Sequence, residues 1–145
     1  MTLSEIKEHV MFQTNNDAED VGDFLPALTD YINEAYDRLV VVWAKAHVIP
    51  GSDDWPPLRE YEESETPSDP RVDTPRTPEW THRYMADWAT WLVYRNGNPQ
   101  KQQRGYAYRE SFLGMLAKIA DEGGMDGLNE DGSQKQYKFF INIPR

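Results

Sequence analysis

Cysteine is absent from the chain, which excludes a disulfide framework, a thiolate metal site and a cysteine nucleophile. Long apolar runs are absent as well, because the longest covers only residues 39–44, far short of the roughly 20 residues that span a bilayer. Glu5 and Glu8 stand where the apolar core of a signal peptide would lie. We therefore expect a soluble protein that is not secreted and does not bind a membrane.

Basic side chains are scarce: 15 Lys and Arg face 25 Asp and Glu, and the formal charge is -10. Such a surface repels phosphate, so non-specific binding to nucleic acid is not expected. Residues 1–50 carry nine acidic and three basic side chains and residues 51–78 eight and three, whereas residues 79–122 carry five and six. Repeated around a ring, the acidic part would form a collar past which a DNA duplex slides without sticking.

Catalytic motifs are also missing, since the chain has no nucleophile elbow, no phosphate-binding glycine loop and no zincin helix. Its three histidines lie on different segments, without partners at the spacing of metal ligands, and are interpreted as ordinary helix residues. Asn129 and Asp131 partly match a calcium loop, but Gly127 and Lys138 replace its first and last carboxylates. We expect no enzyme activity, no cofactor and no metal site.

Two helices are expected before residue 50. Thr2 and Glu5 form the pattern of a capping box in front of a short apolar repeat. Apolar residues then recur three or four positions apart from Leu25 to Ala46, and Pro50 ends this stripe because proline cannot continue the backbone hydrogen bonding.

Two more helices are expected after residue 78. Thr77 and Asn98 each precede a proline that can open a helix, and Gly123 with Gly124 is a candidate stop. A short loop joins these helices, which predicts an antiparallel hairpin. The sequence thus predicts an all-α bundle of about four helices over residues 1–124.

The third expected helix carries more aromatic surface than one core requires. At about 100° per residue its apolar side chains cover an arc of roughly 220°, whereas packing on one core needs about 100°. Aromatic residues are enriched at subunit interfaces, although in a small domain they can also simply fill the interior. We interpret four of these residues as inter-subunit or core contacts: Trp80, Tyr84, Trp88 and Trp91.

Residues 50–78, between the second and third helices, hold seven of the ten prolines and show no periodicity. A segment of this length without periodicity is usually a binding arm or a disordered insert. Trp55, Leu58 and Tyr61 give it apolar side chains with which to dock, which favours an extended acidic arm. A solvated, disordered insert is the alternative.

Residues 125–145 combine a Gly- and Asp-rich hinge with a strand-like tail. No other segment has a strand pattern that pairs with this tail, so its backbone groups and apolar face require another chain's sheet or groove. The alternative is that the tail folds back on its own helices. The apolar residues that alternate in the tail, and that we expect to bind a partner, are Tyr137, Phe139, Ile141 and Ile143.

A family resemblance rests on two stretches. LTDYINEAYDRL at residues 28–39 is followed by Trp43, and YRNGN at residues 94–98 runs into a helix with aromatic residues at Tyr106 and Phe112. This pattern resembles the head–tail adaptor (connector) proteins of tailed bacteriophages, over residues 3–48 and 80–122. The proline-rich residues 50–78 depart from the shorter loops of that family.

The resemblance implies a virion protein, made in the host cytoplasm, that forms a ring, usually a dodecamer, in the neck beneath the portal. The ring would extend the DNA channel, let genomic DNA pass without sequence-specific binding, and offer a platform to a downstream neck or tail protein. It also implies that the C-terminal tail binds the portal protein. The alternative from another class is an acidic DNA-mimic inhibitor of a host nucleic-acid-binding protein, because the net charge of -10 fits both.

Overall fold

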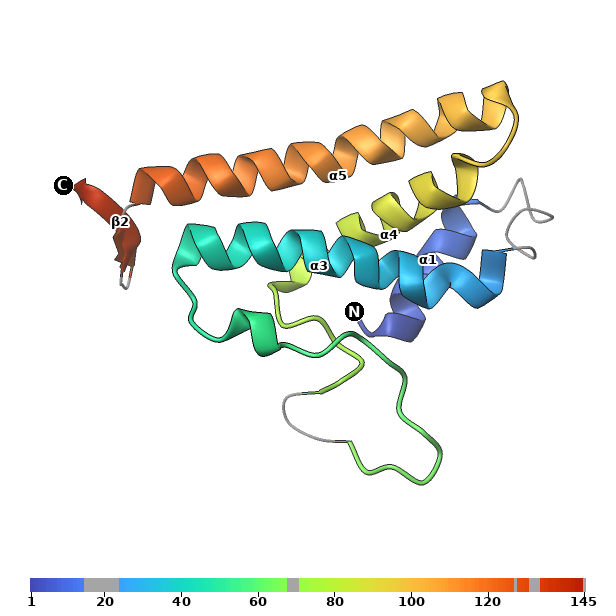
Figure 1. The fold of residues 1–145 in the computed structure, drawn as a ribbon, viewed down its shortest axis with the longest axis horizontal. Coiled ribbons are helices and arrows are strands. Elements are labelled where there is room, and N and C mark those ends of the chain that lie inside the picture. Colours follow the sequence, from blue (N-terminus) through green and yellow to red (C-terminus); the bar gives the residue numbers. More distant parts are fainter. Residues whose placement is uncertain (15–23, 68–70, 127, 131–133, 145) are drawn as a thin grey trace. The chain divides into compact units, whose positions relative to one another are not determined.

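A computed structural model describes residues 1–14, 24–67, 71–126, 128–130 and 134–144. Short 3-10 helices precede and follow the second α-helix, and a β-hairpin lies at the end of the described chain (Figure 1). For the described residues before Leu128, the structure confirms the predicted all-α character and the predicted number of α-helices. The elements are α1 (Leu3–Gln13), η2 (Leu25–Ala27), α3 (Leu28–His47), η3 (Ser52–Asp54), α4 (Glu79–Tyr94), α5 (Pro99–Asp126), β1 (Leu128–Glu130) and β2 (Gln134–Pro144).

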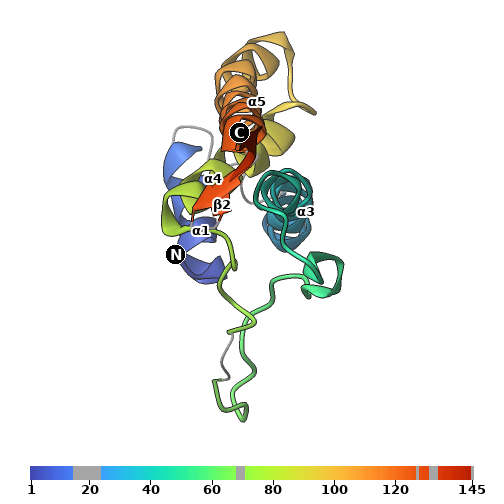
Figure 2. The same ribbon diagram turned by 90° about the vertical axis from the view of Figure 1, so that its left-hand side faces the viewer.

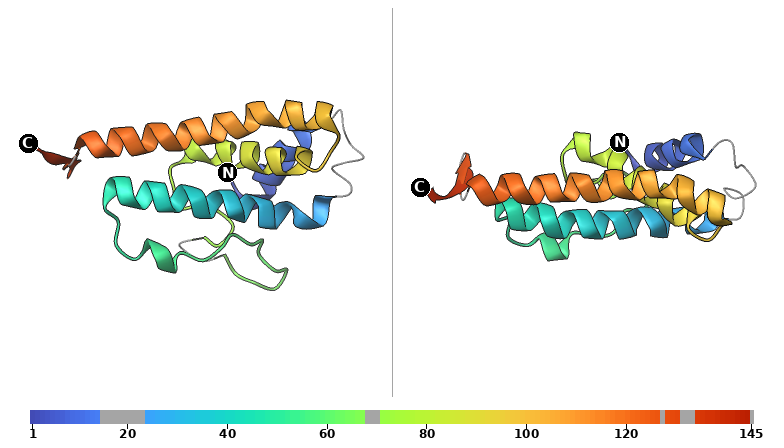
Figure 3. Two further views of the ribbon diagram at one scale, coloured as in Figure 1. Left: turned by 45° about the horizontal axis from the view of Figure 1, so that its top comes forward. Right: turned by 90° about the horizontal axis from the view of Figure 1, so that it is seen from above.

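The chain divides into two compact units. The first unit comprises Met1–Asp37 and Pro56–Phe112, and the second comprises Arg38–Trp55 and Leu113–Arg145. Both α3 and α5 therefore contribute their first part to one unit and the remainder to the other. α5 is 28 residues long and leads from the loop after α4 to the β-hairpin (Figure 3).

The first unit has its core where α1 packs against α4 (Figure 2). The predicted capping box of α1 is confirmed, because Glu5 N donates to Thr2 Oγ1 over 3.2 Å and Thr2 N donates to Glu5 Oε1 over 2.8 Å. Apolar side chains from α1, α3, α4 and the middle of α5 are buried together with one from the proline-rich segment. They are Leu3, Ile6, Val10, Leu28, Ile32, Ala35, Tyr36, Leu58, Met85, Ala86, Trp88, Ala89, Leu92, Val93, Tyr94 and Phe112.

Among its described residues, the second unit buries few apolar side chains. Leu39, Met115 and Ile119 are buried, but Val42 and Ala46 are only half-buried. These last two continue the apolar stripe that the sequence predicts, so the stripe is covered along α3 only as far as its middle. Part of the expected packing surface of α3 is therefore accessible from outside.

Two helix ends differ from the predictions. Pro78 rather than Thr77 takes the capping position of α4, and the Thr77 hydroxyl instead accepts a hydrogen bond of 2.9 Å from Thr81 Oγ1. The α5 helix continues through Gly123 and Gly124 to Asp126, because glycine in a helix costs only about 1 kcal/mol relative to alanine and does not by itself stop it. The Asn98 cap is confirmed, since Lys101 N donates to Asn98 Oδ1 over 3.0 Å.

The prediction that no other segment pairs with the C-terminal strand is wrong. β2 pairs antiparallel with β1, with Leu128 opposite Phe139 and Glu130 opposite Gln134, and the register shifts between these two pairs. A strand of three residues is too short to show an alternating pattern, and for this reason the sequence did not reveal β1.

Candidate assembly surfaces

The proline-rich segment enters the first unit at a fixed point. Asn33 of α3 uses both ends of its amide: Nδ2 donates to Leu58 O over 2.9 Å, and Leu58 N donates to Asn33 Oδ1 over 2.7 Å. The Leu58 side chain is 4% exposed. The segment is thus anchored to α3 by backbone hydrogen bonds and by one buried apolar side chain.

The returning part of the segment is attached at two more points. Leu3 N donates to Asp73 O over 2.6 Å, and Arg76 N donates to Tyr36 Oη over 3.0 Å. Burial raises the pKa of Tyr36, so its hydroxyl stays neutral. Arg71 donates to both carboxylate oxygens of the buried Asp73 over 3.0 Å. We call residues 56–67 and 71–78 the arm, and both of its ends are tied to helices of the first unit.

The arm is also ordered internally. Arg59 N donates to Val72 O over 3.0 Å. This hydrogen bond joins the part of the arm that leaves the helices to the part that returns to them. The Arg59 guanidinium donates to both oxygens of Glu65 over 2.8 and 2.7 Å, and Glu62 N donates to Glu65 Oε1 over 3.1 Å. These bonds lower the pKa of Glu65 to about 2. Glu62 and Glu63 are exposed at the tip, and Figure 2 shows the arm extending away from α1 and α4.

Of the four aromatic residues that the sequence singled out, two belong to the packing of helices. Trp88 is 6% exposed, its Nε1 donates to Glu34 Oε2 over 2.8 Å, and its ring centroid lies 5.1 Å from that of Phe112. Trp91 is half-buried and stacks on Tyr106 at 5.2 Å.

The other two lie together at the start of α4. Trp80 is 49% exposed and meets Tyr84 edge-on, with ring centroids 6.5 Å apart. The Arg83 guanidinium carbon lies 5.1 Å from the centre of the Tyr84 ring, and Arg83 is itself exposed. We call Trp80, Arg83 and Tyr84 the aromatic cluster; its surface is apolar and carries a positive charge.

A close approach between α4 and α5 depends on a glycine that the sequence analysis did not single out. A Cβ at Gly105 would lie 2.8 Å from Trp91 Cε3 and 3.0 Å from Tyr94 Cβ. Gly105 is buried, so it lets the two helices approach where the Trp91 and Tyr106 rings stack. A glycine in mid-helix, which is otherwise unfavourable, is the signal that would have indicated this contact.

Asp87 connects three helices through polar side chains, a role that the sequence analysis also missed. Gln13 of α1 donates to Asp87 Oδ1 over 2.7 Å, and Ser111 of α5 donates to Asp87 Oδ2 over 2.8 Å. Thr90 Oγ1 donates to Gln13 Oε1 over 2.6 Å. In the sequence of α4, Asp87 stands as an acidic residue among aromatic and apolar ones, and this is the trace of the network in the sequence.

His82 is buried at the start of α4. Its Nε2 donates to Thr77 O over 2.8 Å, because a carbonyl oxygen can only accept. Its Nδ1 therefore carries no proton and accepts a hydrogen bond of 2.8 Å from the Met1 amino group. Burial lowers the pKa of His82. The Glu79 carboxylate lies 3.6 Å from the same amino group.

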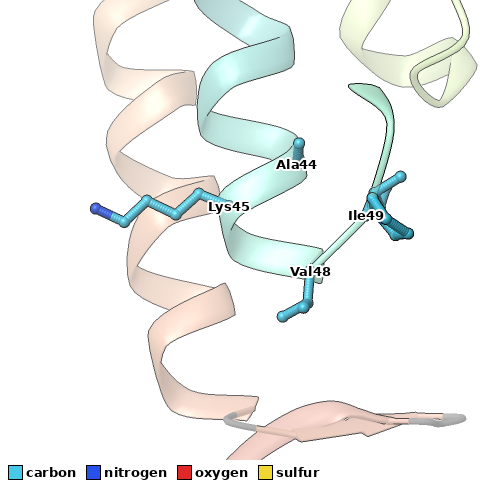
Figure 4. A pocket seen from close by; sticks show the side chains of 5 residues that line it. Ala44, Lys45, Val48 and Ile49 are labelled. Atoms are coloured by element: carbon cyan, nitrogen blue, oxygen red, sulfur yellow. The ribbon is translucent and has the colours of Figure 1, made fainter. Parts of the chain in front are cut away.

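The second unit presents an apolar surface at the end of α3. Val41 is 66% and Val48 82% exposed, and an open pocket of about 540 Å³ is lined by Ala44, Lys45, Val48, Ile49 and Pro50 (Figure 4). The backbone of Val48 has a φ of 52°, in the left-handed region that disfavours a β-branched side chain. A glycine would suit this backbone better, and the valine instead presents an apolar side chain.

The four predicted portal-binding residues occupy alternate positions of β2, and their side chains lie outside the described part of the structure. They are Tyr137, Phe139, Ile141 and Ile143. Pairing with β1 involves only the short segment Leu128–Glu130, whereas β2 spans eleven residues. Their role stays a prediction.

Comparison with known proteins yields no match to a family model, a curated protein or a solved structure. Among the described residues, no three histidine or carboxylate side chains gather closely enough to hold a metal ion. None of the described helices is long and apolar enough to cross a bilayer. Function is therefore inferred from the arm, the aromatic cluster and the end of α3.

Proposed function

We propose that the chain is a structural protein of a tailed-phage virion that assembles into a ring below the portal, joins head to tail and extends the DNA channel. The observation that carries this proposal is the apolar surface on both units, seen in the exposed fractions of Phe12 (78%), Trp80 (49%) and Val48 (82%). Subunits of assemblies cover such residues with their neighbours. The resemblance of residues 3–48 and 80–122 to head–tail adaptors supports the same role.

The charge distribution supports an adaptor over a DNA mimic. A mimic presents carboxylates in an array that imitates phosphates, but three carboxylates of the arm, Asp73 among them, pair with cations. Lys7 Nζ lies 2.6 Å from Glu60 Oε2, and Arg59 holds Glu65 at 2.7 Å. The net charge of -10, which fits both candidates, also suits a channel wall that repels passing DNA.

In this proposal the parts of the chain have separate tasks. The helices form the body of the ring, the proline-rich residues 50–78 carry the arm that projects from it, and the tail on β2 extends into the portal. By the resemblance to head–tail adaptors, the ring is a dodecamer. A downstream neck or tail protein binds to its far side. The chain carries out no catalysis and needs no cofactor or metal.

The test is association with portal-containing capsids. Deletion of residues 134–145 should preserve the far-UV circular dichroism of the helices and abolish binding to capsids. Phe139→Ala and Ile141→Ala should weaken binding, whereas Lys138→Ala and Asn142→Ala, at the intervening positions, should not. Electron microscopy of the wild-type mixture should show a ring on the portal vertex. Unchanged binding of the deletion variant would remove the tail assignment, and binding to one host nucleic-acid-binding protein with no affinity for portal would favour the mimic.

A further inference from the structure

The arm is an ordered projection that contributes little to the core beyond its anchored ends. Hydrogen bonds fix its two ends at Asn33 and Leu3 and close its tip through Arg59 and Glu65. Outside these contacts it exposes the carboxylates of Glu62 and Glu63. An exposed segment that is already ordered loses little conformational entropy when it docks on another surface.

The surface of the arm has a defined chemistry. Besides its acidic tip, the described part of the arm exposes Pro56, Pro57 and Pro67. Proline-rich segments are recognised by aromatic rings, because the chain is already extended and the ring faces pack against the pyrrolidines. A surface that is also to bind the carboxylates of Glu62 and Glu63 needs a cationic side chain next to its aromatic rings.

The same chain carries a surface with these properties. In the aromatic cluster, Trp80 is 49% exposed and Arg83 lies over Tyr84 at 5.1 Å. The Glu79 carboxylate at this end of α4 lies 3.6 Å from the Met1 amino group, which offsets its charge. Within one chain the arm extends away from α4 (Figure 2), so the cluster of its own chain is not the surface that the arm reaches.

We propose that the arm of one copy docks on the aromatic cluster of a second copy, with Glu62 and Glu63 facing Arg83 and the exposed Pro67, which follows them in the chain, facing Trp80 and Tyr84. The contact joins two different surfaces, and each copy carries one of each. Head-to-tail contacts of this kind generate closed rings or filaments rather than isolated dimers. This inference rests on the proposed ring function and names the contact between its subunits.

Charge reversal tests the contact. One variant carries Glu62→Lys and Glu63→Lys, and a second carries Arg83→Glu. Sedimentation velocity over a concentration series should show wild-type oligomers, and each variant alone should self-associate about tenfold more weakly or worse, since like charges now meet at the contact. An equimolar mixture of the two variants, and a single chain with all three changes, should both recover the oligomer. Asp30→Lys with Asp37→Lys, at exposed acids of α3, is the matched control and should assemble like wild type.

The outcomes separate this contact from the proposed function. Wild-type assembly by both reversal variants, or loss of assembly that neither the mixture nor the triple variant restores, would show that the arm does not meet the cluster. Those results leave ring formation itself untouched. A wild-type chain that stays monomeric at every concentration overturns the contact as well, and the capsid-binding experiment then decides separately whether the adaptor role stands. Circular dichroism of each variant confirms that the helices are intact.

Discussion

The side-chain amide of Asn33 pairs with the backbone of Leu58 as a neighbouring strand would, donating to its carbonyl over 2.9 Å and accepting from its N–H over 2.7 Å. The two residues are 25 positions apart. This pair places the start of the arm against α3 and buries the Leu58 side chain. The position of the arm therefore depends on one residue within the helix.

Asn33→Ala should destabilise the protein by about 1–3 kcal/mol, because the Leu58 N–H and carbonyl lose their partners in a partly buried site. Urea denaturation measures this loss, and trypsin should cleave at Arg59 and Arg71 faster than in wild type. Gln103→Ala, at an exposed position of α5, should change stability by less than about 0.5 kcal/mol. Equal protection of the arm in wild type and Asn33→Ala would contradict the anchoring role.

Gly105→Ala should destabilise the protein by about 1–3 kcal/mol in spite of the higher helix propensity of alanine, because the added methyl group overlaps Trp91. Gly114→Ala is the matched control: its Cβ meets nothing within 4 Å, so the substitution should stabilise by about 1 kcal/mol. Guanidinium denaturation followed by tryptophan fluorescence gives both values. Stabilisation by both substitutions would show that α4 and α5 do not pack closely at Gly105.

The stability of the fold should fall as the pH decreases below about 6.5, in part because of His82. Burial lowers the pKa of His82 in the folded state below its ordinary value of 6.5. The unfolded chain therefore binds the proton first, and stability is lost until the pH reaches the folded-state pKa. The charged groups that face the ring are the Met1 amino group and Glu79. Denaturation midpoints of wild type and His82→Gln between about pH 7.5 and 5 should diverge, with the steeper fall in wild type. Parallel curves for wild type and His82→Gln would contradict this role.

Val48→Gly should stabilise the second unit by about 1 kcal/mol, because glycine adopts the left-handed backbone at this position without a steric penalty. Val41→Gly should destabilise by a similar amount, since it places glycine in the interior of α3. Thermal denaturation measures both. A loss of stability in Val48→Gly would mean that its side chain, although 82% exposed, contributes to the fold.

Local signals in the sequence were sufficient for the helices. The capping box at Thr2 and the Asn98 cap act over three residues, and the apolar repeats of α1 and α4 specify which faces can be buried. These features depend on neighbours in the chain, so the sequence displays them directly. The strand β1 was missed because three residues carry no period.

Contacts between distant residues were decided only by the tertiary structure. The mid-helix Gly105 and the acidic Asp87 are unusual positions in the sequence, but neither they nor Asn33 reveal which group they contact, because each acts on a group from another element. The aromatic residues of α4 illustrate the division: their number and spacing are visible in the sequence, but packing alone buries Trp88 and leaves Trp80 half exposed. The sequence by itself determined the helices and the excess of acid and aromatic surface. Only the folded chain decided which of these side chains face outwards, because burial depends on all the elements that pack around a residue.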